Sequence, residues 1–144
     1  MASVYISRMI EAPATAVWAI IRDFNALPDW HPLIVDSRIE AGLASDQVGC
    51  IRAFQLTDGG RIREQLLALS DFDFSSSYSI LDSPMPLQNY VATLKVTPVT
   101  ETNTAFVEWQ ADFDCAASDR DDLIKSIGED VFAAGLQALQ TRLQ

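Results

Sequence analysis

The sequence predicts an α+β domain over residues 1–144, in which a curved antiparallel sheet of about seven strands wraps around one long C-terminal helix. Three observations support this fold class. Residues 118–144 carry apolar side chains at helical spacing along almost their whole length. A run of strand-like segments fills residues 33–114 with only short turns between them. Two short helical segments separate this run from a first strand near the N-terminus.

Prolines divide the first part of the chain. Val4–Ile10 alternates apolar and polar residues and is predicted to be a strand. Pro13 suits the first position of a helix over residues 14–23, because its missing N–H has no partner there in any case. Residues 25–28 break that helix, and residues 29–32 are predicted to form a second short turn or helix.

The remaining strands follow one another with turns that favour antiparallel pairing. They are predicted at residues 33–40, 48–56, 61–70, 74–81, 88–99 and 104–114. Asp58–Gly60 is a turn sequence typical of a tight hairpin. Pro84 and Pro86 exclude ladder hydrogen bonds and predict a loop. Consecutive strands joined this way form a meander, and one of its faces must be covered by another element.

The C-terminal helix is predicted to provide that cover. Ser118 is a favourable N-cap, and the aspartates that follow it place negative charge at the positive end of the helix dipole. Gly128 and Gly135 lie on the apolar stripe, where each costs about 1 kcal/mol of helix propensity relative to alanine. Such small residues leave room for either a close neighbour or a ligand.

Composition excludes several functional classes. The chain has 144 residues, 49% hydrophobic content and a net charge of −10, with no basic stripe for nucleic acid. No apolar run reaches the roughly 18 residues of a membrane span, and no signal peptide is visible, so we expect a cytoplasmic protein. Cys50 and Cys115 stand apart from each other and from the single histidine, His31. We therefore expect no metal site and no cofactor. The oligomeric state does not follow from the sequence.

Strand alternation predicts which side chains face the helix. Each inward set combines an aromatic or charged residue with neighbours that are mostly aliphatic or aromatic: Trp109 with Val107, Ala111 and Phe113; Tyr90 with Ala92, Leu94 and Val96; Tyr78 with Ile80; Glu64 with Ile62, Leu66 and Ala68; Arg52 with Cys50 and Phe54. A buried charge must be paired, so we expect Arg52 to pair with Glu64 across the hairpin. The pair could be a structural salt bridge, or it could form, with Tyr78 and Tyr90, the polar end of an apolar pocket.

The chain resembles the helix-grip fold of the START-like or SRPBCC superfamily, which includes polyketide cyclases, lipid-transfer domains and plant abscisic-acid receptors. The resemblance covers essentially the whole chain and rests on short stretches in matching order: Ala12–Ala14 with Val17–Trp18, Phe24–Pro32, Val48–Arg52, Glu64–Leu66, Gln88–Tyr90 and the C-terminal helix. It implies a cavity between sheet and helix for an apolar or aromatic small molecule.

In the plant receptors, the positions matching Glu64 and Tyr90 take part in a water-linked ligand network. Other receptor features are absent: the Gly-Leu-Pro core of the gating loop, the histidine–arginine pair of the latch loop, and a lysine near His31. A hormone-receptor function is therefore not supported. An apolar pocket mouth remains, formed by Leu33, Met85, Pro86 and Leu87.

Two functions are consistent with these features. The first is binding of a hydrophobic small molecule such as a lipid, an isoprenoid or a polyketide-like aromatic compound. The alternative is an enzyme of the polyketide cyclase, aromatase or dehydratase type, with Glu64, Tyr90 and His31 as candidate catalytic residues. A protein-interaction role would require an exposed apolar patch near Met85–Leu87. The candidate ligand-binding residues are Trp30, His31, Leu33, Arg52, Phe54, Glu64, Tyr78, Leu87, Tyr90, Trp109, Ile127, Val131 and Gly135.

Overall fold

The computed structural model describes residues 1–144, and its strands form one antiparallel seven-stranded sheet in the order β1-β7-β6-β5-β4-β3-β2. The strands are β1 (Ala2–Ile10), β2 (Ile34–Ile39), β3 (Ile51–Leu56), β4 (Arg61–Ser70), β5 (Ser75–Asp82), β6 (Leu87–Val99) and β7 (Thr104–Cys115). The helices are α1 (Ala14–Ile21), α2 (Leu27–Trp30), the short 3₁₀ turn η1 (Glu40–Gly42), α3 (Arg120–Ser126), the π-helical segment η2 (Ile127–Ala133) and α4 (Ala134–Arg142). The predicted fold class is confirmed.

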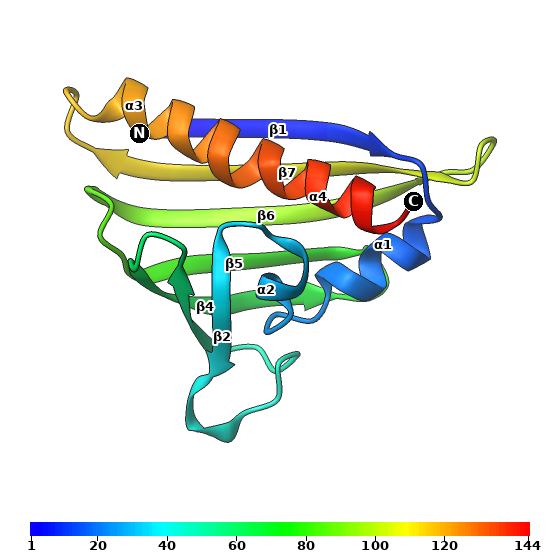
Figure 1. Cartoon of the computed structure of the whole chain (residues 1–144), viewed down its shortest axis with the longest axis horizontal. Helices are drawn as coiled ribbons and strands as arrows, with labels where there is room; N and C mark the ends of the chain where they lie inside the picture. The colour runs from blue at the N-terminus through cyan, green and yellow to red at the C-terminus, as the bar shows by residue number, and fades with distance from the viewer.

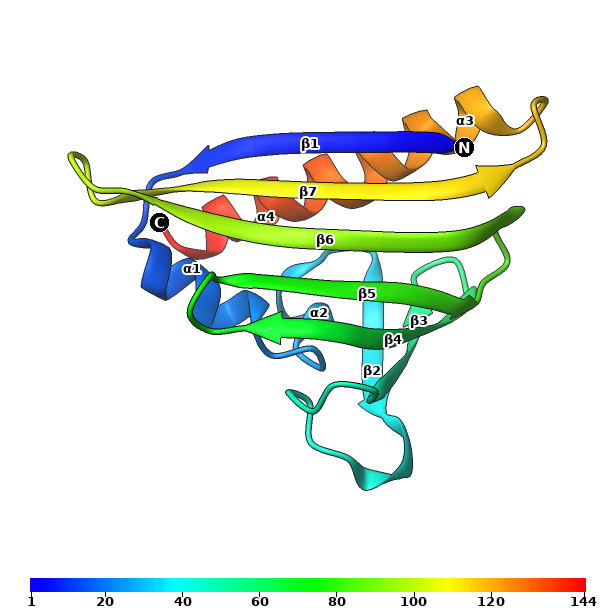
Figure 2. The ribbon, with the colours of Figure 1, turned by 180° about the vertical axis from the view of Figure 1, so that it is seen from behind.

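All the helices lie on one face of the sheet. Figure 1 shows the C-terminal helix running across β1 and β7, with α1 and α2 lower on the same side. Seen from behind, the outer face of the sheet carries no helix (Figure 2). The sheet curls, so that β2 crosses in front of the central strands and faces the same interior as the helix. The core therefore lies between the curled sheet and its helices.

The inward-facing sets predicted from alternation are buried, except for Ile80, which is half-buried, and Ala68, which is exposed. Val107, Trp109, Ala111 and Phe113 of β7 are each at most 2% exposed. On the outer face, Tyr5 donates a hydrogen bond to Glu108 across the β1–β7 pair. Ala68 was predicted to face inward, and this is wrong. The β4–β5 register shifts between Leu66 and Ala68, and this irregularity reverses the alternation, so that Ala68 is exposed.

The C-terminal helix is continuous from Arg120 to Arg142, but its middle is π-helical. Phe132, in this π segment, is fully buried and stacks on Trp109 with ring centroids 4.4 Å apart. The prediction that Ser118 caps the helix is wrong. Asp119 occupies the N-cap position without a side-chain capping bond, and the helix begins at Arg120.

Some other element boundaries also differ from the prediction. Pro28 belongs to the first turn of α2, where a proline is tolerated, and does not break the chain before that helix. The helix predicted over residues 14–23 ends at Ile21. The strand predicted from Val48 begins only at Ile51, because Gly49 has a φ of +96° in the left-handed region, which regular strands do not adopt.

A cavity between the sheet and the C-terminal helix

A cavity of about 690 Å³ lies between the curled sheet and the π-helical segment. This volume lies within the range of roughly 300–1,000 Å³ typical of small-molecule sites. The cavity is lined by the segment from α2 to the start of β2, by strands β3 to β7, by the β3–β4 turn, by the β5–β6 loop and by the C-terminal helix. The apolar wall residues include Leu27, Ile34, Phe54, Leu56, Ile62, Ile80, Ile127 and Val131.

Most of the predicted ligand-binding residues line this cavity; the exceptions are Trp30, Leu87 and Gly135. Trp30 is buried beside Trp109, with ring centroids 5.9 Å apart. Leu87 opens β6 and is half-buried against the core without reaching the cavity wall. Gly135 lies behind His31. Of the predicted mouth residues, Leu33, Met85 and Pro86 line the cavity. Their role in binding a ligand stays a prediction.

Arg52 and Glu64 form the predicted buried pair. They are directly opposite each other in the β3–β4 ladder, and each side chain is 7% exposed. Arg52 Nε donates to Glu64 Oε1 at 2.8 Å, and Nη2 lies 2.6 Å from the same oxygen. Nη1 donates to the backbone carbonyl of Phe24 at 3.0 Å, and the Phe24 ring lies 3.9 Å from the guanidinium carbon. Contacts at all three nitrogens hold the guanidinium in place.

The second carboxylate oxygen of Glu64 faces the cavity. Every side-chain nitrogen or oxygen that is fully shielded from solvent has a hydrogen-bond partner. Oε2 makes no hydrogen bond, and the Tyr90 hydroxyl interacts with the neighbouring Tyr78 hydroxyl; neither atom is fully shielded, and both Glu64 and Tyr90 line the cavity. Burial raises the pKa of Glu64, and Arg52 opposes that rise. Burial also raises the pKa of Tyr90, with further contributions from Tyr78 and Glu64.

Tyr78 links this polar end to the aromatic core. Its hydroxyl accepts a hydrogen bond from Trp109 Nε1 at 3.1 Å, and its ring lies 6.2 Å from the Phe24 ring. Burial raises the pKa of Tyr78, so the phenol stays protonated. The Tyr78 hydroxyl also interacts with the Tyr90 hydroxyl, and because one hydrogen suffices for the bond between the two phenols, the other remains available as a donor.

Both ring nitrogens of His31 are already used. Nδ1 accepts from the backbone N–H of Leu33 at 3.2 Å, so Nε2 carries the proton and donates to the carbonyl of Val131 at 2.7 Å. The residue is 2% exposed, and burial lowers its pKa. In this arrangement His31 ties the loop after α2 to the π-helical segment, and neither nitrogen is free to act as a general base.

Gly135 makes this packing possible. A Cβ atom there would lie 2.8 Å from His31 Cδ2 and 3.0 Å from Trp109 Cζ3. From the sequence, the helix glycines could make room either for a close neighbour or for a ligand, and at Gly135 the structure shows a close neighbour. A Cβ at Gly128 would meet Val4 at 3.4 Å, which is ordinary contact.

The sequence reasoning missed several residues at the mouth. Asp58 and Thr57 come from the hairpin turn, and Ser126 and Asp130 from the helix. Helical spacing could have found Asp130, because it follows Ile127 by three residues on the same side of the helix. Ser126 and Asp130 are exposed, and a reading based on apolar periodicity assigns such positions to solvent.

A long helix laid across a curled antiparallel sheet, with a cavity between them, is the START-like helix-grip arrangement. A family model described as "Polyketide cyclase / dehydrase and lipid transport" matches residues 1–144, and the chain belongs to this family. The protein XoxI from Bacillus cereus is 34% identical, with a TM-score of 0.88 over 99% of this chain and 96% of that one. A protein from Thermobifida fusca is 32% identical, with a TM-score of 0.90 over 99% of this chain and 93% of that one.

More distant structures share the fold alone. Ginseng major latex-like protein 151 from Panax ginseng is 13% identical, with a TM-score of 0.82 over 99% of this chain and 97% of that one. None of the curated proteins compared with this chain matches it. No helix in the structure is both long and apolar enough to cross a membrane.

Proposed function

We propose that this protein binds a hydrophobic small molecule, such as a lipid, an isoprenoid or a polyketide-like aromatic compound, in the cavity between the sheet and the C-terminal helix. The observation that carries the proposal is the cavity itself, a chamber of about 690 Å³ in which 14 of the 24 lining residues are hydrophobic and the Arg52–Glu64 pair lies among them. Small-molecule sites are usually built this way, because apolar walls provide affinity and a few polar groups provide orientation.

The lining supports this proposal energetically. The charges of Arg52 and Glu64 compensate each other, so the chamber can desolvate an apolar ligand without exposing it to an unpaired interior charge. Burial of apolar ligand surface contributes roughly 25 cal/mol per Å². The π-helical segment forms one wall, and π-helical turns occur frequently at functional sites.

Titration with a neutral fluorescent dye tests the proposal. N-phenylnaphthylamine becomes bright in apolar surroundings, and we expect saturable binding to the purified protein. Ile80→Trp adds bulk inside the cavity and should weaken dye binding strongly. Leu81→Trp is the matched control, because Leu81 is the next residue in β5 and is 44% exposed. Equal binding by both variants, or no saturable binding by the parent protein, would count against the proposal.

Native mass spectrometry addresses the ligand class. The purified protein is weighed intact and again after denaturation, and any released molecule is identified. A released lipid, isoprenoid or aromatic compound would name the ligand class and support the carrier function. A released polar metabolite would contradict it.

The free polar atoms of the cavity favour a second candidate function, an enzyme of the cyclase or dehydratase type. Glu64 Oε2 could move a proton, and the Tyr90 hydroxyl could donate a hydrogen bond to a carbonyl oxygen. Incubation with a linear poly-β-keto ester, followed by mass spectrometry for loss of water, tests this function. Glu64→Gln should abolish turnover and retain dye binding. Unchanged turnover in that variant would exclude Glu64 as the acid or base.

A further inference from the structure

The polar end of the cavity has no cation free to bind an anionic ligand. Arg52 is the only lysine or arginine among the lining residues, and its three nitrogens contact Glu64 and the Phe24 carbonyl. His31 is held in its neutral form with both ring nitrogens bonded. Lys125, on the same helix, lines the groove beside β1 and not this cavity.

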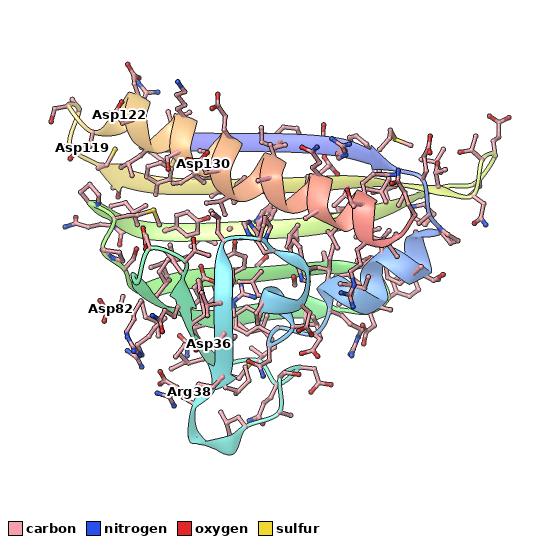
Figure 3. The ribbon with its side chains drawn as sticks, in the orientation of Figure 1. Asp36, Arg38, Asp82, Asp119, Asp122 and Asp130 are labelled. Atoms are coloured by element: carbon pink, nitrogen blue, oxygen red, sulfur yellow. The ribbon has the colours of Figure 1, made fainter.

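The mouth adds negative charge. Asp58 and Asp130 both line the opening, and Asp130 makes no ion pair. Figure 3 shows Asp130 on the C-terminal helix, away from Asp122 near the start of that helix. The whole chain carries a net charge of −10, which also repels anions. A fatty carboxylate or a phosphate ester entering this cavity would lose its hydration without gaining a partner of opposite charge.

The uncommitted groups instead match a hydroxyl. Glu64 Oε2 can only accept a hydrogen bond while Glu64 is ionised in its pair with Arg52. The Tyr90 hydroxyl can donate one when Tyr78 supplies the hydrogen for the bond between the two phenols. An alcohol or phenol can satisfy both at once, because it donates through its hydrogen and accepts through its oxygen. A carboxylate has no hydrogen to donate and would bring a second negative charge beside Glu64.

We propose that the cavity selects uncharged amphiphiles whose polar head is a hydroxyl group, and that it discriminates against the corresponding carboxylates. The head group exchanges hydrogen bonds with Glu64 Oε2 and the Tyr90 hydroxyl, while the apolar body lies against the helix and β5. This inference rests on the proposed binding function and specifies the chemical class of its ligand.

Three probes with the same apolar chain test the selectivity: dodecanol, dodecanoate and dodecyl methyl ether. Each competes with N-phenylnaphthylamine at about pH 7.5, where a carboxylic acid is ionised. We expect dodecanol to displace the dye at roughly tenfold lower concentration than dodecanoate, and the ether to lie between them. Dodecanoate binding as tightly as dodecanol would overturn the inference and leave the proposed function intact. Failure of the dye and of all three probes to bind would overturn both.

Two variants, each with a matched control, test which residues make the cavity prefer the alcohol to the carboxylate. Tyr90→Phe should remove the advantage of dodecanol over the ether, whereas Tyr5→Phe, on the outer face of β1, should leave it unchanged. Asp130→Asn should improve dodecanoate binding more than Asp122→Asn does, because Asp122 does not line the cavity. An unchanged preference in Tyr90→Phe would refute the assigned role of that hydroxyl.

Discussion

The buried ion pair can be compared with a more exposed one, between β4 and the 3₁₀ turn η1. Arg52 and Glu64 are each 7% exposed, whereas Arg63 and Glu40 form a similar contact, with Nε–Oε2 at 2.7 Å, at 42% and 24% exposure. In Arg52→Leu, the Glu64 carboxyl stays buried without a countercharge. Removing one partner of a buried pair destabilises a protein by about 3–5 kcal/mol. Arg63→Leu is the matched control and should lower the free energy of unfolding only slightly, because solvent screens that pair.

Urea unfolding followed by tryptophan fluorescence measures both variants. Single domains have total stabilities of about 5–15 kcal/mol, so the loss in Arg52→Leu should appear either as a large fall in the urea midpoint or as unfolding without urea. The double variant Arg52→Leu/Glu64→Leu should recover most of the loss, because apolar replacement of a whole buried pair is often neutral. Equal losses for Arg52→Leu and Arg63→Leu would refute the reasoning. A double variant as unstable as Arg52→Leu would also contradict it.

The pH dependence provides a second readout of the same variant. Without Arg52, burial alone acts on Glu64 and raises its folded-state pKa above the unfolded value of roughly 4.3. A group with a raised folded-state pKa contributes stability below its unfolded pKa and loses that contribution as pH rises through the folded pKa. The stability difference between Arg52→Leu and the parent protein should therefore become smaller as the pH falls toward the unfolded pKa of Glu64, roughly 4.3.

Three further predictions follow from the packing. Gly135→Ala should lower the free energy of unfolding in urea by about 1–3 kcal/mol, because its Cβ would overlap His31. Gly128→Ala is the control and should gain up to about 1 kcal/mol from helix propensity. A Gly135→Ala variant as stable as the parent protein would contradict the close contact. Burial lowers the folded-state pKa of His31, so its contribution to stability is present above the unfolded pKa of roughly 6.5 and is lost as pH falls; His31→Gln should flatten that acidic decline, and an unchanged pH profile would argue against it. Cys50 is fully buried and burial raises its pKa, so a thiol reagent should label the half-buried Cys115 first and Cys50 only on unfolding, with simultaneous labelling as the contrary result.

The sequence was sufficient to predict the sheet and its central pair. A tight turn at Asp58–Gly60 sets the register of β3 and β4, and a period of two then places Arg52 and Glu64 on the same inner face. The same alternation predicted that Trp109, Tyr78 and Tyr90 are buried. These predictions need only the two-residue alternation of a strand and the length of a turn, and both can be recognised in the sequence.

The parts that depend on long-range placement could not be predicted. No clear sequence signal marks the register shift between Leu66 and Ala68, so strict alternation wrongly places Ala68 on the inner face. The bond from His31 to the Val131 carbonyl joins residues a hundred positions apart and requires the position of the helix over the sheet. The same is true of Gly135, whose close neighbour is visible only once His31 has been placed.

The most direct test of the central claim is a crystal structure of the protein grown with saturating dodecanol. We expect electron density for the alkyl chain between the sheet and the π-helical segment, with the hydroxyl within hydrogen-bond distance of Glu64 Oε2 and the Tyr90 hydroxyl. Dodecanol bound only on the surface, or a cavity closed by its own side chains in the presence of the alcohol, would contradict the account.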